Sequence, residues 1–422
     1  MSVKPSIAAT ASAGPSPWRV AVAGMVALAV AMGIGRFAFT PLLPMMLHDG
    51  VVDLPTASWL ASANYIGYLV GALLCTFQPW IWARLKGLPP VVPAFMVRGG
   101  LAATCVLTLG MAWHWSAVWP LLRLVSGVAS AFVFVYTSGW CLAKLARLGV
   151  PEMGGYIYVG PGAGITLSGL FASAMVAHGW TASSGWLLFA ALALGLTVWV
   201  WPVFQRAEAV AASAGAMVAP AATAPVPAHE KGQMATLTAA YGLAGFGYII
   251  TATFLPVIAR GVLGNSVWID LFWPIFGLGV MLGAVLATRV PRNADMRQWL
   301  AYCYLMQGVG VLASVVLPSA LGFALGSLCL GLPFTAITFF AMQEVRRLRP
   351  AAVASSMGLL TAMYGLGQIV GPPLVALVIR HSSSQAMGFT LSLGLAASTL
   401  FVGAALYLWM LRRYPMAVGV RP

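Results

Sequence analysis

Long apolar blocks constrain the fold of this chain more than any other feature. Each block covers about 20 residues or more, and at about 1.5 Å per residue a helix of that length crosses a hydrocarbon layer of about 30 Å. Only 7% of the 422 residues are charged and 61% are hydrophobic, whereas soluble domains carry about 25% charged residues. The sequence therefore predicts an all-α membrane protein. The twelve predicted membrane-spanning helices cover residues 18–46, 56–79, 91–112, 116–143, 153–177, 183–204, 235–258, 267–288, 297–317, 319–342, 353–379 and 386–411.

The basic residues lie mainly on one side of the predicted spans. The formal net charge of +14 would suit a nucleic-acid-binding protein if the charges formed a patch. With the amino terminus placed in the cytoplasm, most of the 22 lysines and arginines instead fall in cytoplasmic loops and tails. The positive-inside rule then predicts that both termini are cytoplasmic, as in a bacterial inner-membrane protein. No nucleic-acid partner is needed to explain the charge.

One long polar stretch divides the chain into two parts. Residues 205–234 are rich in Ala and Pro, a composition that predicts a flexible cytoplasmic linker. It separates an N-terminal six-helix bundle at residues 18–204 from a C-terminal six-helix bundle at residues 235–411. Residues 1–17 are predicted to be a disordered tail, and residues 412–422 a C-terminal tail.

No motif of the sequence indicates an enzyme or a bound cofactor. The chain has no P-loop, no HExxH metal motif and no paired-carboxylate constellation. Its five cysteines all lie within predicted spans and lack metal-ligand spacing. We therefore expect no enzymatic activity, no cofactor and no metal site.

The two halves of the chain repeat each other at an offset of 212 residues. GIGRFAFTPLLP in the first predicted span matches GFGYIITATFLP in the seventh, with its glycines and last proline in register. Gly67 and Gly71 of the second span match Gly279 and Gly283 of the eighth in the same register. Glycines four residues apart predict close packing of helix backbones. Two parallel repeats of six helices are typical of transporters whose substrate site lies between the halves.

The stretch MGIGRFAFTPLLPMM resembles the signature of the YbfB/YjiJ-type branch of the major facilitator superfamily, and the resemblance covers nearly the whole chain. It implies two pseudo-symmetric six-helix bundles that rock about a central site in alternating access. RLVSGVASA in the fourth span is similar to the family's motif B, and YVGPGAG in the fifth matches part of the GPxxGG motif associated with antiporters. The resemblance implies coupling or conformational roles for Arg123, Gly127, Gly160, Pro161 and Gly164. For Arg123 the alternative is a side chain that snorkels to the nearby end of its span.

Motif A of the family is degenerate in this chain. Cys75 occupies the position of the expected Asp, and only Arg84 and Lys86 keep the basic character of the loop. The corresponding stretch of the second half, GAVLATRVPR, contains Arg289 and Arg292 but again no acid. We assign these four basic residues to gating loops.

Arg36 is the most unusual charged residue. It lies about 15 Å from the end of the first predicted span, where an arginine costs about 2.5–3.5 kcal/mol on insertion scales. Gly33, Gly35, Pro41 and Pro44 around it predict an interrupted helix, which is typical of a transport site. We interpret Arg36 as a bidentate anchor for a carboxylate or another small anion. The alternative is a structural brace that binds backbone carbonyls of a neighbouring helix.

Aromatic and polar side chains of other spans are predicted to line the rest of the path. Tyr248 occupies the repeat position of Arg36, and Asn64 and Tyr68 share a helical face. For each aromatic residue the alternative is core packing or lipid contact. The residues predicted to bind substrate are Arg36, Phe37, Phe39, Thr40, Asn64, Tyr65, Tyr68, Tyr248, Trp273, Tyr364 and Gln368.

Acidic residues and histidines are almost absent from the predicted spans. Asp270, in the first turn of the eighth span, is the exception. We consider a coupling role for it, with helix capping as the alternative. The remaining centre is positively charged, which favours an anionic or polar substrate. Any proton would then travel with the substrate, or the protein would exchange one anion for another.

These observations predict a secondary active transporter that moves a small organic anion or amphiphile across the inner membrane as a monomer. Two alternatives stay open. A proton-coupled exporter of drugs or cations would require a buried acid, and a membrane sensor could keep the fold without transporting anything.

Overall fold

The structure is a computed structural model that describes residues 16–85, 91–113, 115–214, 228–264, 266, 268–291, 294–349 and 353–416. Within these ranges all regular secondary structure is helical. Twelve spans of the described residues are long and apolar enough to cross a membrane. The prediction of an all-α membrane protein with twelve transmembrane helices is therefore confirmed.

The spans of the N-terminal half follow each other in chain order. They are α1 (Pro17–Leu28) with η1 (Ala29–Ile34) and α2 (Phe39–His48), α3 (Leu54–Arg84), α4 (Pro93–Gly110), η2 (Ser116–Val118) with α5 (Trp119–Arg147), η3 (Pro151–Tyr158) with α6 (Val159–Ala177), and α7 (Ala182–Ala214). The C-terminal half contains α8 (Ala228–Leu263), η4 (Ile269–Leu271) with α9 (Phe272–Ala287), α10 (Met296–Val316), α11 (Ala320–Gly331) with α12 (Phe334–Leu348), α13 (Val353–His381) and α14 (Gln385–Arg413).

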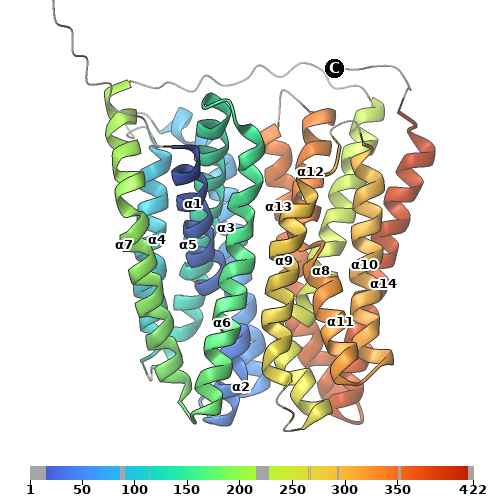
Figure 1. Cartoon of the computed structure of the whole chain (residues 1–422). Helices are drawn as coiled ribbons and strands as arrows, with labels where there is room; N and C mark the ends of the chain where they lie inside the picture. The colour runs from blue at the N-terminus through green and yellow to red at the C-terminus, as the bar shows by residue number, and fades with distance from the viewer. Residues whose placement is uncertain are drawn as a thin grey trace, which may run out of the picture.

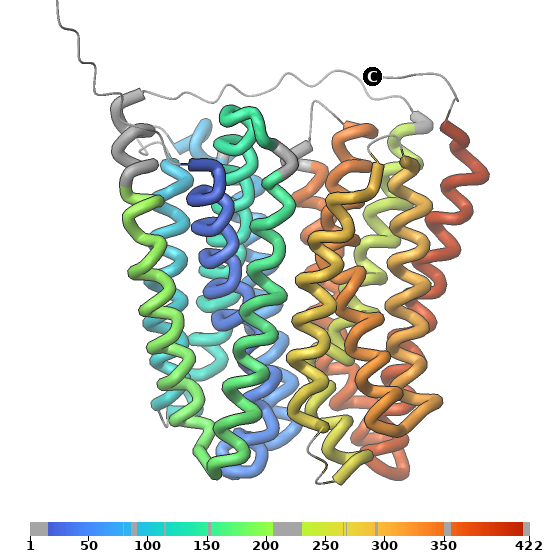
Figure 2. The backbone as a smooth tube through the Cα atoms, in the orientation of Figure 1, coloured from blue at the N-terminus to red at the C-terminus, as the bar shows by residue number. Residues whose placement is uncertain are grey.

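The two groups of six spans stand side by side, as Figure 1 shows and the backbone tube of Figure 2 confirms. Helix α1 begins and α14 ends at the same end of the bundle. We call this the terminal end, and the opposite end the distal end. That the terminal end faces the cytoplasm stays a prediction from the distribution of charge.

Helices α7 and α8 extend into the stretch predicted to be a linker. Helix α7 continues to Ala214, and α8 begins at Ala228. The predicted disorder of the N-terminal tail, the linker centre and the end of the C-terminal tail concerns residues 1–15, 215–227 and 417–422, which lie outside the described residues.

The two halves touch along two seams. In one seam α6 packs on α9: Gly155 lies beside Thr288 toward the terminal end, and Gly169 lies beside Pro274 toward the distal end. In the other seam α3 packs on α13, where the Ser62 hydroxyl donates a hydrogen bond to the Ile369 carbonyl at 3.1 Å. The halves are thus in contact toward both ends of the bundle.

The sequence repeat corresponds to equivalent packing contacts. In the first half, Gly71 of α3 lies against the carbonyl of Val128 in α5. In the second half, Gly283 of α9 lies against the carbonyl of Leu332, which follows α11. Both glycines allow a neighbouring backbone to approach more closely than any side chain would permit.

We expect Gly67→Ala to lower the free energy of unfolding by about 1–3 kcal/mol, the usual cost of overpacking. The added Cβ would lie 1.8 Å from the Leu124 carbonyl oxygen, so that one helix must shift. Thermal unfolding of the purified protein in detergent measures the effect. Gly99→Ala in α4 is the matched control, because nothing lies within 4 Å of its added Cβ. Equal unfolding midpoints for the two variants would refute the close-packing interpretation.

Candidate functional site

The first span is broken at the depth of Arg36, as its glycines and prolines predicted. Residues 29–34 form a π-helix, and a non-helical turn at residues 35–38 separates it from α2. The backbone N–H of Phe37 donates to the carbonyl of Met32 at 3.0 Å, the longer spacing of a π-helix. Such irregular turns leave backbone carbonyls without their normal helical partners.

Side chains of α5 bind the carbonyls of the broken segment. Arg123 is 2% exposed, and its Nη1 and Nη2 donate to the carbonyls of Gly35 and Arg36, both at 3.3 Å. The hydroxyl of Ser126 donates to the Gly35 carbonyl at 2.9 Å, and that of Ser130 to the Ala31 carbonyl at 2.9 Å. A structural brace that binds backbone carbonyls was the alternative role predicted for Arg36. In the structure Arg123 has this role.

Arg36 itself makes a different set of contacts. Its Nη2 donates to Oε1 of Gln368, in the other half, at 2.5 Å. Its guanidinium lies 4.0 Å from the ring centroid of Tyr68 and 5.4 Å from those of Phe37 and Tyr65. The side chain is only 4% exposed. The space beside the Arg36 guanidinium is thus filled by aromatic rings and an amide group.

The C-terminal half completes this arrangement. The amide nitrogen of Gln368 donates to the hydroxyl of Tyr248, the residue at the repeat position of Arg36. Tyr248 stacks on Tyr364 with ring centroids 5.5 Å apart and planes at 21°. Arg36 and Tyr248 therefore meet through Gln368 where the two halves join.

Two further hydrogen bonds join the halves in this region. The hydroxyl of Tyr65 lies 3.0 Å from that of Thr253, and the Thr40 hydroxyl donates to the carbonyl of Ala252 at 2.9 Å. The central cluster is defined here as all the residues predicted to bind substrate together with Phe334 and Thr253. The structure brings all the predicted residues together, some of them by contact with a shared neighbour. The ring of Phe39 packs on the guanidinium of Arg123, and the amide nitrogen of Asn64 donates to the Arg123 carbonyl. The ring of Trp273 packs beside that of Phe37.

Phe334 was missed by the sequence analysis. Its ring lies 6.0 Å from that of Phe37 and 4.9 Å from that of Tyr248. It follows a break in the tenth span, where α11 ends at Gly331 and α12 begins after Pro333. The signal was present in the sequence as GLPF inside an apolar block, since glycine and proline interrupt helices.

The sequence model described as "Uncharacterised MFS-type transporter YbfB" matches residues 28–408, which include both halves. The chain belongs to this major facilitator family. Comparison with curated proteins gives no match.

The remaining motif residues of this facilitator pack against the broken first span or its neighbours. Gly127 of α5 lies against the carbonyl of Asn64, Gly160 of α6 against that of Met25, and Gly164 against the Cα of Gly33. Pro161 is buried beside Gly160 in α6. These residues let α5 and α6 approach α3 and the broken span closely, and their role in coupling stays a prediction.

The predicted gating residues are only partly described. Arg84 stacks on Trp80, with its guanidinium 4.0 Å from the ring centroid. Arg289 is exposed after α9. Lys86 and Arg292 lie outside the described residues.

Asp270 does not cap a helix. Helix α9 has Leu271 at its N-cap position, without a side-chain cap, and Asp270 accepts a hydrogen bond from Arg260 at 3.1 Å. The capping interpretation was therefore wrong, because a nearby cation binds this carboxylate instead. The coupling role of Asp270 stays a prediction.

A buried charge network at the terminal end was also missed. Arg297, which is fully buried, binds Asp295 at 2.7 Å and the Tyr414 carbonyl at 2.7 Å. Glu344, 1% exposed, binds Arg347 at 2.5 Å. The network ties the ends of α10, α12 and α14 together within the C-terminal half. The sequence placed these residues at helix ends, where charges are usually solvated.

Hydrogen-bond donors exceed acceptors in and around the central cluster. Among the described residues, three donors are buried without a hydrogen-bond partner, namely the Nε of Arg36, the Nε of Arg123 and the Nε1 of Trp273, against one such carbonyl acceptor of the cluster, the Oδ1 of Asn64. Neither arginine forms an ion pair with a described carboxylate. Likewise, no group of described His, Cys, Asp or Glu side chains could hold a metal ion. The chemistry of the cluster suits a ligand that accepts hydrogen bonds and carries negative charge.

Proposed function

We propose that this protein is a secondary active transporter of a bacterial inner membrane that carries a small organic anion or anionic amphiphile by alternating access. Its family supports membrane transport. The observation that carries the proposal is Arg36, a cation buried between the two halves without a described carboxylate partner. A carboxylate would bind its guanidinium through charge-assisted hydrogen bonds, which are about twice as strong as those of a neutral amide.

In this proposal the Gln368 side chain occupies the position on Arg36 that the substrate anion would bind. Its neutral amide oxygen accepts from Arg36, and its amide nitrogen donates to Tyr248. An incoming anion would displace the amide oxygen from Arg36, while the aromatic rings would contact the apolar part of the substrate. Because Arg36 and Gln368 belong to different halves, this exchange links substrate binding to the contact between the halves.

The contacts between the halves support a closed intermediate of the transport cycle. Seams on both sides of the central cluster join the halves toward both ends. Separation at one end would expose Arg36 to one side of the membrane, and separation at the other end would expose it to the opposite side. Alternating access requires these two movements about one site.

A screen of anions against the purified protein tests the substrate class. A ligand that binds the folded state raises its thermal stability by mass action. We expect one or more small mono- or dicarboxylates to raise the unfolding midpoint at constant ionic strength, and the same compounds to exchange across proteoliposomes. Stabilisation by organic cations alone would favour the drug-exporter alternative. Binding without any exchange would favour the sensor alternative.

A further inference from the structure

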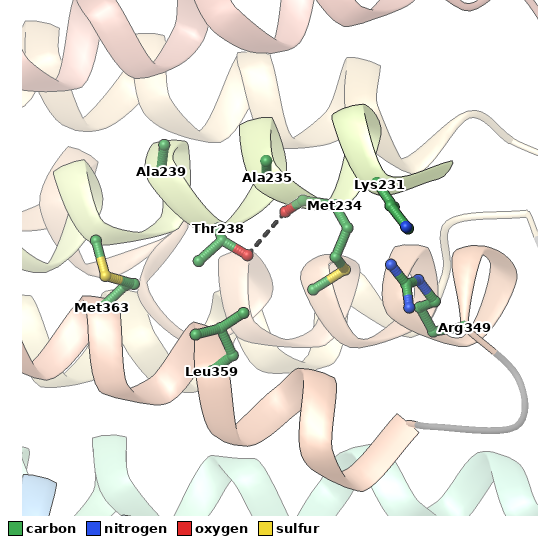
Figure 3. A pocket seen from close by; sticks show the side chains of 8 residues that line it. All are labelled: Lys231, Met234, Ala235, Thr238, Ala239, Arg349, Leu359 and Met363. Carbon is green, nitrogen blue, oxygen red and sulfur yellow. Dashed lines mark hydrogen bonds between the residues drawn. The ribbon is translucent and has the colours of Figure 1, made fainter. Parts of the chain in front are cut away.

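An apolar groove lies at the terminal end of the C-terminal half, away from the central cluster. Figure 3 shows it between the first turns of α8 and the beginning of α13. It has a volume of about 400 Å³. The residues that line it are Lys231, Met234, Ala235, Thr238, Ala239, Arg349, Leu359 and Met363.

Two cations stand at one end of the groove. The side chains of Lys231 and Arg349 point toward each other in Figure 3. Among the described residues neither side chain has an ion pair or a hydrogen bond, and the Nε of Arg349 is buried without a partner. Like charges that face each other are unfavourable unless an anion lies between them. Glu230 cannot easily fill that role for Lys231, because adjacent helical residues point to different faces.

The groove lies at the depth of a lipid headgroup and its first acyl segment. The membrane-spanning part of α8 begins at Glu230, and Arg349 lies between the spans that end at Leu348 and begin at Ser356. From Lys231 the lining continues to Ala239, about 12 Å deeper at about 1.5 Å per residue. The charged end thus lies at the membrane surface and the apolar end within the hydrocarbon.

The groove faces lipid and is apolar along its length. Leu359 is 51% exposed, and the same exposed face of α13 continues through Leu366 and Val370. The face of α13 that carries Gln368 is the buried one. The Thr238 hydroxyl donates to the Met234 carbonyl at 2.7 Å, so that it presents little polarity to the groove.

We propose that this groove binds one anionic phospholipid of the adjacent leaflet, with the phosphate between Lys231 and Arg349 and an acyl chain along Met234, Leu359 and Met363. Charge complementarity selects an anionic headgroup, because a zwitterionic one brings no net negative charge to two unpaired cations. The inference does not depend on the proposed substrate of the central cluster.

Native mass spectrometry of the full-length protein with phosphatidylglycerol or phosphatidylcholine tests this site. We expect the parent protein to retain one phosphatidylglycerol preferentially. Removal of one cation should lower its affinity about fivefold, and the pair Lys231→Gln with Arg349→Gln about 25-fold. Ala239→Phe, at an exposed position, should fill the groove and weaken binding while both cations remain.

The pair Arg19→Gln with Arg147→Gln is the matched control, because it removes two exposed cations of the terminal end from the other half. It should bind phosphatidylglycerol like the parent. An equal loss in this control would show a diffuse surface charge and overturn the proposal. Full competition by soluble glycerol phosphate would also overturn it, since that result indicates a site for a free anion.

Discussion

Arg36→Lys is expected to weaken anion binding by about 10- to 100-fold and to stop transport, although the positive charge is kept. Lysine is a point donor on a flexible stem and cannot reproduce the planar fork of a guanidinium stacked on Tyr68. Loss of one hydrogen bond to a charged group costs about 1.5–3 kcal/mol, which gives this range. Thermal-shift titration with the best anion of the screen measures binding, and exchange in proteoliposomes measures transport.

Arg98→Lys is the matched control for this substitution. Arg98 also lies within a span, but its guanidinium stacks on Trp201, a residue of α7 outside the central cluster, at 4.3 Å from the ring centroid. Its replacement should leave anion affinity unchanged. If Arg36→Lys binds and transports the anion like the parent, Arg36 is not the anchor.

Gln368→Glu provides an opposite test of the same arrangement. The new carboxylate would lie at the position of the amide oxygen that accepts from Arg36, and it would compete with the substrate from within the chain. Anion binding should fall at least about tenfold, because an intramolecular partner acts at high effective concentration. The folded protein should not lose stability, since a buried cation gains a carboxylate partner. Undiminished anion binding would contradict the proposed displacement of Gln368.

The architecture and the choice of central residues were accessible from the sequence for physical reasons. Hydrocarbon thickness fixes the length of each apolar block, which is why the blocks match the observed spans. Because a guanidinium is costly to bury in a membrane, Arg36 was predicted to be a functional residue. The glycines and prolines around it predicted the broken helix. Repeat symmetry then predicted a role for Tyr248. In the structure the side chains of Tyr248 and Arg36 both form hydrogen bonds with the amide group of Gln368.

The parts that were missed depend on contacts that local sequence does not encode. Arg36 and Arg123 are both arginines within spans, and only the fold shows that Arg123 reaches the carbonyls released by the broken helix. Glu344 occupies a helix end in the sequence, yet it is buried in the fold, where α12 packs on α10 and Arg297 of α10 lies 3.9 Å from the Glu344 carboxylate. The enclosure of Arg36 likewise depends on how the two halves meet, which is a contact between residues far apart in the chain.

The two buried arginines therefore have distinct roles, and a stability measurement separates them. Arg123→Lys should lower the free energy of unfolding by about 1.5–3 kcal/mol, because one of the two charge-assisted bonds to the carbonyls of Gly35 and Arg36 is lost. The substitution keeps the positive charge, but an ammonium is more strongly hydrated than a guanidinium and costs more to bury, which acts in the same direction. Thermal unfolding in detergent measures the loss, and hydrogen exchange should rise in peptides that cover residues 29–38.

Arg84→Lys serves as the control for this stability effect. Arg84 stacks on a ring at the terminal end and donates no described bond to a helix carbonyl, so its replacement should change stability by less than about 0.5 kcal/mol. Ser126→Ala should give an intermediate loss of about 1 kcal/mol, because it removes one neutral hydrogen bond to the Gly35 carbonyl. A normal exchange rate at residues 29–38 in Arg123→Lys would mean that the broken helix holds its shape without α5, and the brace assignment would then fail.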